Sequence, residues 1–159
     1  MSFEPIYTPQ SKILILGTYP SPLSFQNGFY YGNPRNRFWQ LMAELTNEPL
    51  PQTNEEKIQF LLETNIALWD VLDSCDIVGA ADSSIKNPVA NDISSLLSKT
   101  RISGVFLNGA KAAELYQKYG QPSPQTPFRK LPSTSPANAA FQMERLRLEW
   151  SCILPFLGK

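Results

Sequence analysis

The side chains best suited to recognising a flat polar ligand crowd into residues 17–39, GTYPSPLSFQNGFYYGNPRNRFW. Two adjacent tyrosines end at Tyr31 and offer ring faces on which a planar group could stack. A helix beginning at Asn33 would place Asn36 and Arg37 in its first turn, where free backbone N–H groups favour an anion or a polar ligand. Stacking, an amide and a helix N-terminus together suggest a nucleobase in a nucleic acid. The structural alternatives are that Tyr31 is a buried core residue and that Asn36 only caps the helix.

The residue inventory narrows the chemistry. The 159-residue chain contains no histidine, and its two cysteines, Cys75 and Cys152, lie far apart in sequence. These counts exclude a four-cysteine cluster, the common zinc sites and a histidine-based triad. We therefore expect no metal and no cofactor, and chemistry based on amides, hydroxyls, carboxylates and backbone dipoles. Fourteen basic and fourteen acidic residues cancel, which weighs against bulk electrostatic coating of nucleic acid but allows local phosphate contacts.

Four apolar runs predict strands, and helical patterns lie between them. The first run, residues 12–17, is continuous, which is typical of a strand buried on both faces of a parallel sheet. The other expected strands cover residues 66–70, 104–107 and 129–131. Helices are expected at residues 33–42, 54–62, 91–97, 110–119 and 141–150, and loops at residues 18–32 and 74–88.

This alternation predicts an α/β fold, a three-layer α/β/α sandwich with a short, mainly parallel four-stranded central sheet, in a single domain spanning residues 1–159. Parallel strands present their carboxyl ends at one edge, which is where open α/β sheets bind ligands. The residues delivered to that edge would be Tyr19, Asp70, Asn108 and the Ser-Thr-Ser run at 133–135. Such a cleft suits an uncharged polar ring.

Three motifs carry a resemblance to a known family: GTYPS at residues 17–21, NPRNRFW at 33–39 and LPSTSP at 131–136. In them the chain resembles the uracil-DNA glycosylase superfamily, and most closely its hypoxanthine-DNA glycosylase branch, also called DNA-deoxyinosine glycosylase or family six. The resemblance covers nearly the whole chain and implies the uracil-DNA glycosylase-like form of the sandwich. Shorter segments in the family's order lie at residues 68–72, 82–86 and 107–109.

The resemblance implies roles for residues at the predicted sheet edge. The first motif of the superfamily normally carries a catalytic Asn or Asp that positions water, and Tyr19 stands in that place here. In the hypoxanthine branch, catalysis falls instead to the asparagine of the helix-start motif, which corresponds to Asn36, and Asn108 is implicated with it. Tyr31 would stack on the flipped base. Tyr19 and Asp70 would also contact that base, Asp70 near the base-reading residue of the second strand.

DNA contacts are expected around the same edge. Arginine and lysine side chains, with the hydroxyls and N–H groups of the LPSTSP motif, would hold the flanking phosphates. The family usually begins this motif with His or Asn and supplies a larger wedge that enters the duplex, and this chain departs from both patterns. The residues expected to contact DNA are Arg35, Arg37, Lys130, Ser133, Thr134, Ser135 and Ala137.

These features predict a monofunctional DNA glycosylase that flips a deaminated base, hypoxanthine in deoxyinosine, out of DNA and hydrolyses its N-glycosidic bond to initiate base excision repair. Three alternatives remain: uracil as main substrate of a mismatch-specific enzyme, a module that binds altered DNA without cutting it, and an enzyme of free nucleosides. The expected partner is DNA containing a deaminated base. A cytoplasmic location is expected, because no secretory signal begins the chain and no apolar run reaches the roughly 20 residues of a membrane helix. A monomer without membrane contact is also expected.

Overall fold

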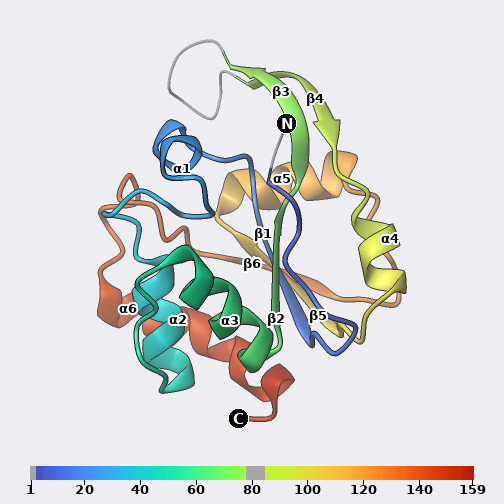
Figure 1. Ribbon diagram of the computed structural model, residues 1–159. Helices are drawn as coiled ribbons and strands as arrows, with labels where there is room; N and C mark the ends of the chain where they lie inside the picture. The colour runs from blue at the N-terminus through green and yellow to red at the C-terminus, as the bar shows by residue number, and fades with distance from the viewer. Residues whose placement is uncertain (1–2, 78–84) are drawn as a thin grey trace.

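The computed structural model describes residues 3–77 and 85–159 and has a four-stranded sheet at its centre (Figure 1). Its strands are β1 (Ile13–Gly17), β2 (Ile66–Asp70), β5 (Gly104–Asn108) and β6 (Phe128–Leu131). They are ordered β2-β1-β5-β6, and each neighbouring pair is parallel. The predicted α/β class and parallel sheet are confirmed, and the strand bounds lie within about one residue of those expected.

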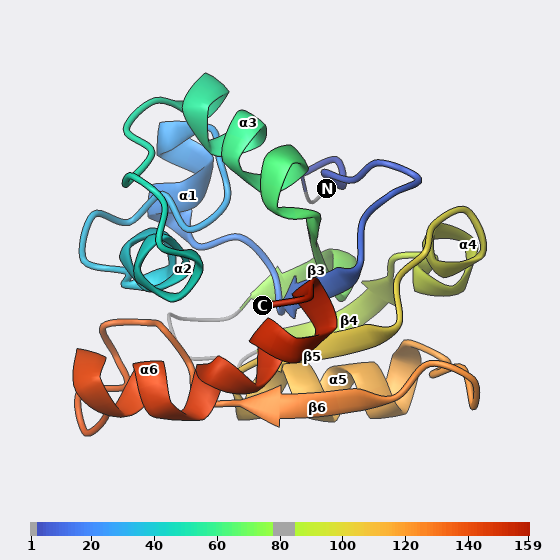
Figure 2. The ribbon, with the colours of Figure 1, turned by 90° about the horizontal axis from the view of Figure 1, so that it is seen from below.

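Helices cover both faces of this sheet. One face carries α2 (Phe38–Thr46), α3 (Asn54–Thr64), α6 (Met143–Trp150) and the 3₁₀ helix η2 (Ser151–Leu157). The opposite face carries α4 (Ile93–Ser98) and α5 (Ala110–Tyr119). The view from below in Figure 2 separates α2 and α3 from α4 and α5. The predicted three-layer sandwich is therefore confirmed.

The side chains of β1 alternate between two hydrophobic cores. All five residues of this strand are buried. Ile13 and Ile15 pack on the side of α2, α3 and α6, whereas Leu14 and Leu16 pack on the side of α4 and α5. Because successive side chains of a strand point to opposite faces, an unbroken apolar run requires a covering layer on each side.

The segment between β1 and α2 is more ordered than predicted. The expected loop at residues 18–32 contains a short helix, α1 (Pro22–Asn27), whose N-terminus is capped by Ser21. The Ser21 Oγ accepts the Ser24 N–H at 3.1 Å, which is the usual preference of serine at this position. The prediction of an irregular segment here was wrong, because the Ser-Pro pair that breaks a strand also starts a helix.

Helix α2 begins at Phe38 rather than at Asn33. The Asn33 Oδ1 accepts the Arg35 N–H at 2.9 Å, and the Asn33 carbonyl accepts the Asn36 N–H at 2.9 Å. These bonds form turns that compete with a helix. Asn36 and Arg37 therefore lie just ahead of the helix, and their predicted place in its first turn was wrong.

A second, two-stranded sheet replaces much of the predicted 74–88 loop. Strand β3 (Leu72–Ile77) pairs antiparallel with β4 (Ile85–Ala90), with register shifts on either side of Ser74. These irregularities disturb the alternation by which a strand is recognised in sequence. Residues 82–84 of the family segment 82–86 lie outside the described residues. No helix in the described residues is long and apolar enough to cross a membrane.

Candidate active site

A cavity of about 190 Å³ opens at the carboxyl edge of the central sheet. The ends of β1, β2 and β5 bring Gly17, Asp70 and Asn108 to it, so the strand ends converge as predicted. The segment between β1 and α2 and the loop after β6 complete its lining. The predicted site residues that line the cavity are Tyr19, Tyr31, Asn36, Asp70, Asn108, Ser133, Thr134 and Ser135.

Two donors hold the side-chain oxygen of Asn36. Its Oδ1 accepts the Thr134 hydroxyl at 2.7 Å and the Phe38 N–H at 3.0 Å, so the same oxygen also satisfies the start of α2. Among the described residues, no hydrogen bond engages the Asn36 Nδ2. The amide is thus oriented by the protein while its N–H donors stay available to a ligand in the cavity.

Thr134 links Asn36 to Asn108. The Asn108 Nδ2 donates to the Thr134 Oγ1 at 3.0 Å, and the Thr134 N–H donates to the Asn108 Oδ1 at 3.0 Å. A hydroxyl has a single hydrogen, so Thr134 accepts from Asn108 and donates to Asn36. This Asn108–Thr134–Asn36 network joins β5, the loop after β6 and the start of α2. Because Thr134 is fully buried within it, its hydroxyl does not face DNA phosphates as the sequence had suggested.

Asp70 and Tyr31 meet over Gly17 at the inner wall of the cavity. The parallel register pairs Gly17 with Asp70. A Cβ atom placed on Gly17 would lie 2.6 Å from the Asp70 Oδ1 and 3.1 Å from the Tyr31 Oη. The Asp70 side chain is buried, and this burial raises the pKa of its carboxyl to about 7. Glycine is therefore required at this point of β1, because any side chain would displace the carboxyl or the phenol.

The Tyr31 ring is fixed with its hydroxyl edge at this wall. The ring stacks on Phe38, with centroids 4.2 Å apart and planes inclined by 23°. The Tyr31 φ of 52° lies in the left-handed region, which is strained for a bulky residue. Burial and the nearby Asp70 raise the pKa of the Tyr31 hydroxyl by more than the neighbouring Asn108 side chain lowers it, which keeps the hydroxyl a protonated donor. Since Phe38 covers one ring face, base stacking on Tyr31 stays a prediction.

Tyr19 occupies the first-motif position near the cavity mouth. The side chain is half-buried and packs edge-on against Phe25, with ring centroids 5.6 Å apart. Burial, followed by the nearby Cys75 and Asp73, raises the pKa of the Tyr19 phenol. The residue can therefore act as a neutral hydrogen-bonding group, in the place where the superfamily normally carries a catalytic Asn or Asp.

Arg37 holds the loop after β6 rather than facing solvent. Its guanidinium donates to the carbonyl oxygens of Phe141, Ser135 at 2.9 Å and Asn138 at 3.2 Å, and its Nε donates to the Thr134 carbonyl at 3.4 Å. Nearly all of its donors are thereby engaged by the protein. Arg37 thus has a structural role in holding this loop, and its DNA contact stays a prediction.

A family model described as the uracil DNA glycosylase superfamily matches residues 4–153. The chain belongs to this superfamily. It is therefore a DNA glycosylase by class, and its substrate is DNA. The resemblance found in the three sequence motifs is confirmed by this match, which spans most of the chain.

Relatives of this glycosylase are found among curated proteins and solved structures. A hypoxanthine DNA glycosylase of Methanosarcina acetivorans is 35% identical over 155 residues, which cover 95% of each chain. A hypoxanthine DNA glycosylase of Methanosarcina barkeri is 33% identical over 114 residues, covering 70% of this chain and 72% of that protein. The solution NMR structure of a putative uracil DNA glycosylase from Methanosarcina acetivorans aligns with a TM-score of 0.82 and 33% identity, covering 99% of this chain and 97% of the other.

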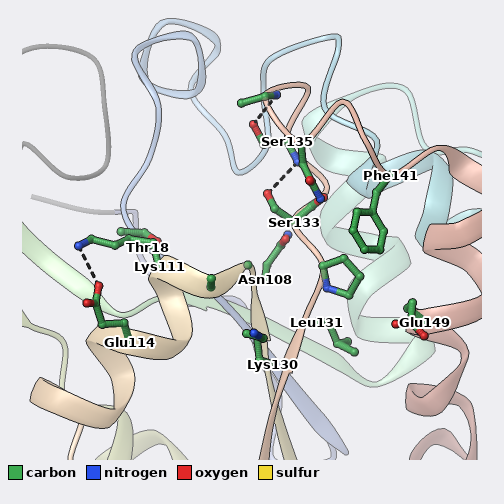
Figure 3. A pocket seen from close by; sticks show the side chains of 15 residues that line it. Thr18, Asn108, Lys111, Glu114, Lys130, Leu131, Ser133, Ser135, Phe141 and Glu149 are labelled. Atoms are coloured by element: carbon green, nitrogen blue, oxygen red, sulfur yellow. Dashed lines mark hydrogen bonds and ion pairs between the residues drawn. The ribbon is translucent and has the colours of Figure 1, made fainter.

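A wider groove of about 900 Å³ adjoins the cavity of this superfamily member and shares Thr18, Asn108, Ser133 and Ser135 with it (Figure 3). Lys111 lies on one side, paired with Glu114 at 2.9 Å. The predicted DNA-contacting residues that line the groove are Lys130, Ser133, Ser135 and Ala137. Arg35 is solvent-exposed. No group of three or more potential metal ligands occurs in the described part of the glycosylase.

Two features of the glycosylase site were missed in the sequence. Gly17 was identified as the end of a strand and the start of the first motif, but its close contact with other groups was not predicted, although a glycine at the carboxyl end of a buried strand signals such an approach. The bonding of Thr134 to both asparagines was also missed. Thr134 lies 26 positions from Asn108 and 98 positions from Asn36 in the sequence, and no local pattern signals either contact.

Proposed function

We propose that this chain is a monofunctional DNA glycosylase that removes hypoxanthine from deoxyinosine in DNA. The observation that carries the proposal is the Asn36 amide, whose Oδ1 is held by Thr134 and Phe38 while its Nδ2 remains available beside the cavity. Two relatives, each named as a hypoxanthine DNA glycosylase, support the choice of base. The product would be an abasic site, from which base excision repair proceeds.

Catalysis follows from the arrangement of the amide. A target base must leave the duplex to enter the cavity, at a cost of a few kcal/mol that is smaller at a mispair. Cleavage of the N-glycosidic bond then develops positive charge on the sugar and negative charge on the departing base. The Asn36 N–H would donate to that base or hold the attacking water, and one such preorganised donor contributes about 3 kcal/mol. The Thr134 bond fixes the amide before substrate arrives, so little reorganisation is needed.

The remaining residues would bind the substrate. Asp70 and Tyr31 would contact the base at the inner wall, and Tyr19 would lie near the cavity mouth. Arg35, Lys130 and the neighbouring serines would contact flanking phosphates. Asn108 would act through Thr134, because both ends of its amide bond that residue. The described residues that line the cavity include no lysine, which supports water rather than an amine as the nucleophile.

A cleavage assay tests the proposal. Matched oligonucleotides containing deoxyinosine, deoxyuridine or only undamaged bases, single-stranded and opposite each base, are incubated with excess enzyme and developed with alkali. We expect strand breaks at deoxyinosine. Breaks only at deoxyuridine would replace hypoxanthine with uracil, the runner-up. Binding to either lesion without breaks would make the protein a reader of altered DNA. Release of hypoxanthine from free inosine alone would make it an enzyme of nucleosides.

A further inference from the structure

Within the described residues, two buried side-chain atoms lack a hydrogen-bond partner, the Asp70 Oδ2 and the Tyr31 Oη. Buried polar groups are nearly always paired, and each exception needs an explanation. Both atoms line the same cavity, and their side chains meet over Gly17. Tyr31 also keeps a strained left-handed backbone conformation, a feature that tends to persist at functional sites. The two exceptions therefore form one unsatisfied pair.

The pair has a defined hydrogen-bonding sense. An ionised carboxylate only accepts hydrogen bonds, whereas the Tyr31 phenol remains protonated and can donate. The register of β1 with β2 fixes Asp70, and stacking on Phe38 fixes Tyr31. A ligand that satisfies both must present a hydrogen-bond donor next to an acceptor, as a ring N–H beside a carbonyl does.

We propose that Asp70 and Tyr31 are a specificity pair that reads the lactam edge of a deaminated base. The Asp70 carboxylate accepts the ring N–H, and the Tyr31 hydroxyl donates to the adjoining carbonyl. This inference rests on the proposed glycosylase function, and it names the chemical feature by which the site would select its base.

The pair would explain how adenine and cytosine, the bases whose deamination gives hypoxanthine and uracil, are rejected. Hypoxanthine and uracil each carry a ring N–H beside a carbonyl, whereas adenine and cytosine carry a bare ring nitrogen beside an amino group. Adenine would direct a nitrogen lone pair at the Asp70 carboxylate, and that carboxylate would stay unpaired. Sites that hydrogen-bond a substrate group strongly reject an analogue that lacks it, because the buried partner is then left unsatisfied. Discrimination would thus follow the change that deamination makes.

The Asp70 carboxylate depends on the ligand for a hydrogen bond to its Oδ2, which has no partner among the described residues. The titratable side chains that face it are Tyr19, Tyr30 and Tyr31, and Asn91 donates to its backbone carbonyl at 2.8 Å. Below a pH of about 7 the carboxyl gains a hydrogen, and it can then donate to a bare ring nitrogen. Discrimination between hypoxanthine and a purine without the lactam is therefore expected to narrow as the pH falls below this value.

Release of hypoxanthine and of unsubstituted purine from oligonucleotides containing deoxyinosine or deoxynebularine tests the pair. Purine lacks both the ring N–H and the carbonyl. Tyr31→Phe removes the hydroxyl and keeps the ring, so single-turnover release of hypoxanthine should fall about ten- to hundredfold, while release of purine stays within about twofold of the parent rate. Asp70→Asn can rotate its amide to donate to a bare nitrogen, so the hypoxanthine-to-purine ratio should fall at least about tenfold.

Tyr116→Phe is the matched control. It also removes the hydroxyl of a buried tyrosine, one on α5 that does not line the cavity, and the ratio should equal that of the parent. An unchanged ratio in Tyr31→Phe, or an equal loss of rate on both substrates, would overturn the proposed role of the pair.

If the parent releases neither base, the proposed function fails, and binding of the same oligonucleotides, measured by anisotropy, tests the role of the pair separately. The parent should then prefer deoxyinosine over deoxynebularine, and Tyr31→Phe should not; equal preference in both proteins overturns the pair. The same binding comparison applies if purine release is too slow to measure.

Discussion

The Thr134 hydroxyl bridges the two asparagines of the site, and its removal should slow base release by disturbing Asn36. Thr134→Val keeps the shape of the side chain and deletes the hydroxyl. The Asn36 Oδ1 then retains only the Phe38 N–H, and the Asn108 Nδ2 loses its acceptor. We expect the variant to fold and to bind DNA, with an Asn36 amide that is less firmly oriented.

The size of the effect follows from the bonds that are lost. A neutral hydrogen bond contributes a net 1 kcal/mol or so, and loss of that bias lowers the population of the oriented amide about fivefold. Single-turnover release of hypoxanthine should therefore fall roughly three- to tenfold. The unpaired Asn108 donor should also lower the free energy of unfolding by about 1–3 kcal/mol.

Single-turnover release from a deoxyinosine duplex measures this effect, and urea unfolding measures the stability. Thr64→Val is the matched control, because Thr64 is a buried threonine whose hydroxyl donates to the Phe60 carbonyl at 2.7 Å. Thr134→Ser should restore the rate, since the hydroxyl returns. The double variant Asn36→Ala with Thr134→Val should be no slower than Asn36→Ala alone. A rate equal to that of the parent in Thr134→Val, or additive losses in the double variant, would refute the reasoning.

Three further predictions concern groups near this network. Burial raises the folded-state pKa of Asp70 from 3.8 to about 7, so burial of the ionised carboxylate destabilises the fold most above pH 7 and has no such effect below pH 4. Asp70→Asn should therefore raise the free energy of unfolding in urea by on the order of 4 kcal/mol at pH 8 and leave it nearly unchanged at pH 4. Arg37→Lys should lower the Tm by about 5–10 °C in a thermal melt, because loop carbonyls lose their donors, and a changed salt dependence of DNA binding would instead support a phosphate contact. Gly17→Ala should reduce hypoxanthine release at least about tenfold, with DNA affinity by anisotropy as the control, since its Cβ would lie 2.6 Å from the Asp70 Oδ1; parent-like release would contradict the tight packing at this wall.

The sheet could be predicted because its strands are apolar and buried on both faces. The short, continuous apolar runs at β1, β2 and β5 are typical of strands buried on both faces, and parallel pairing then brings their carboxyl ends together. The β3–β4 hairpin could not be predicted in this way. Its strands are partly polar and their register shifts around Ser74, so neither alternation nor an apolar run marks them.

The members of the site could be predicted, but their bonding could not. Asn36, Asp70 and Asn108 were identified from motif and strand-end positions, and all line the cavity. The start of α2 was misplaced because Asn33 and Asn36 bond backbone groups ahead of the helix. The role of Thr134 depends on contacts between distant segments, which a single sequence does not encode in any local pattern.

Asn36 is the most direct test of the account. Single-turnover release of hypoxanthine from a deoxyinosine duplex is measured for the parent and for Asn36→Ala, with affinity for the same duplex measured by anisotropy. The account predicts that release falls at least about tenfold, and as much as about a hundredfold, while the Kd stays within about twofold of the parent value. A variant that releases hypoxanthine as fast as the parent would contradict a catalytic role for the Asn36 amide.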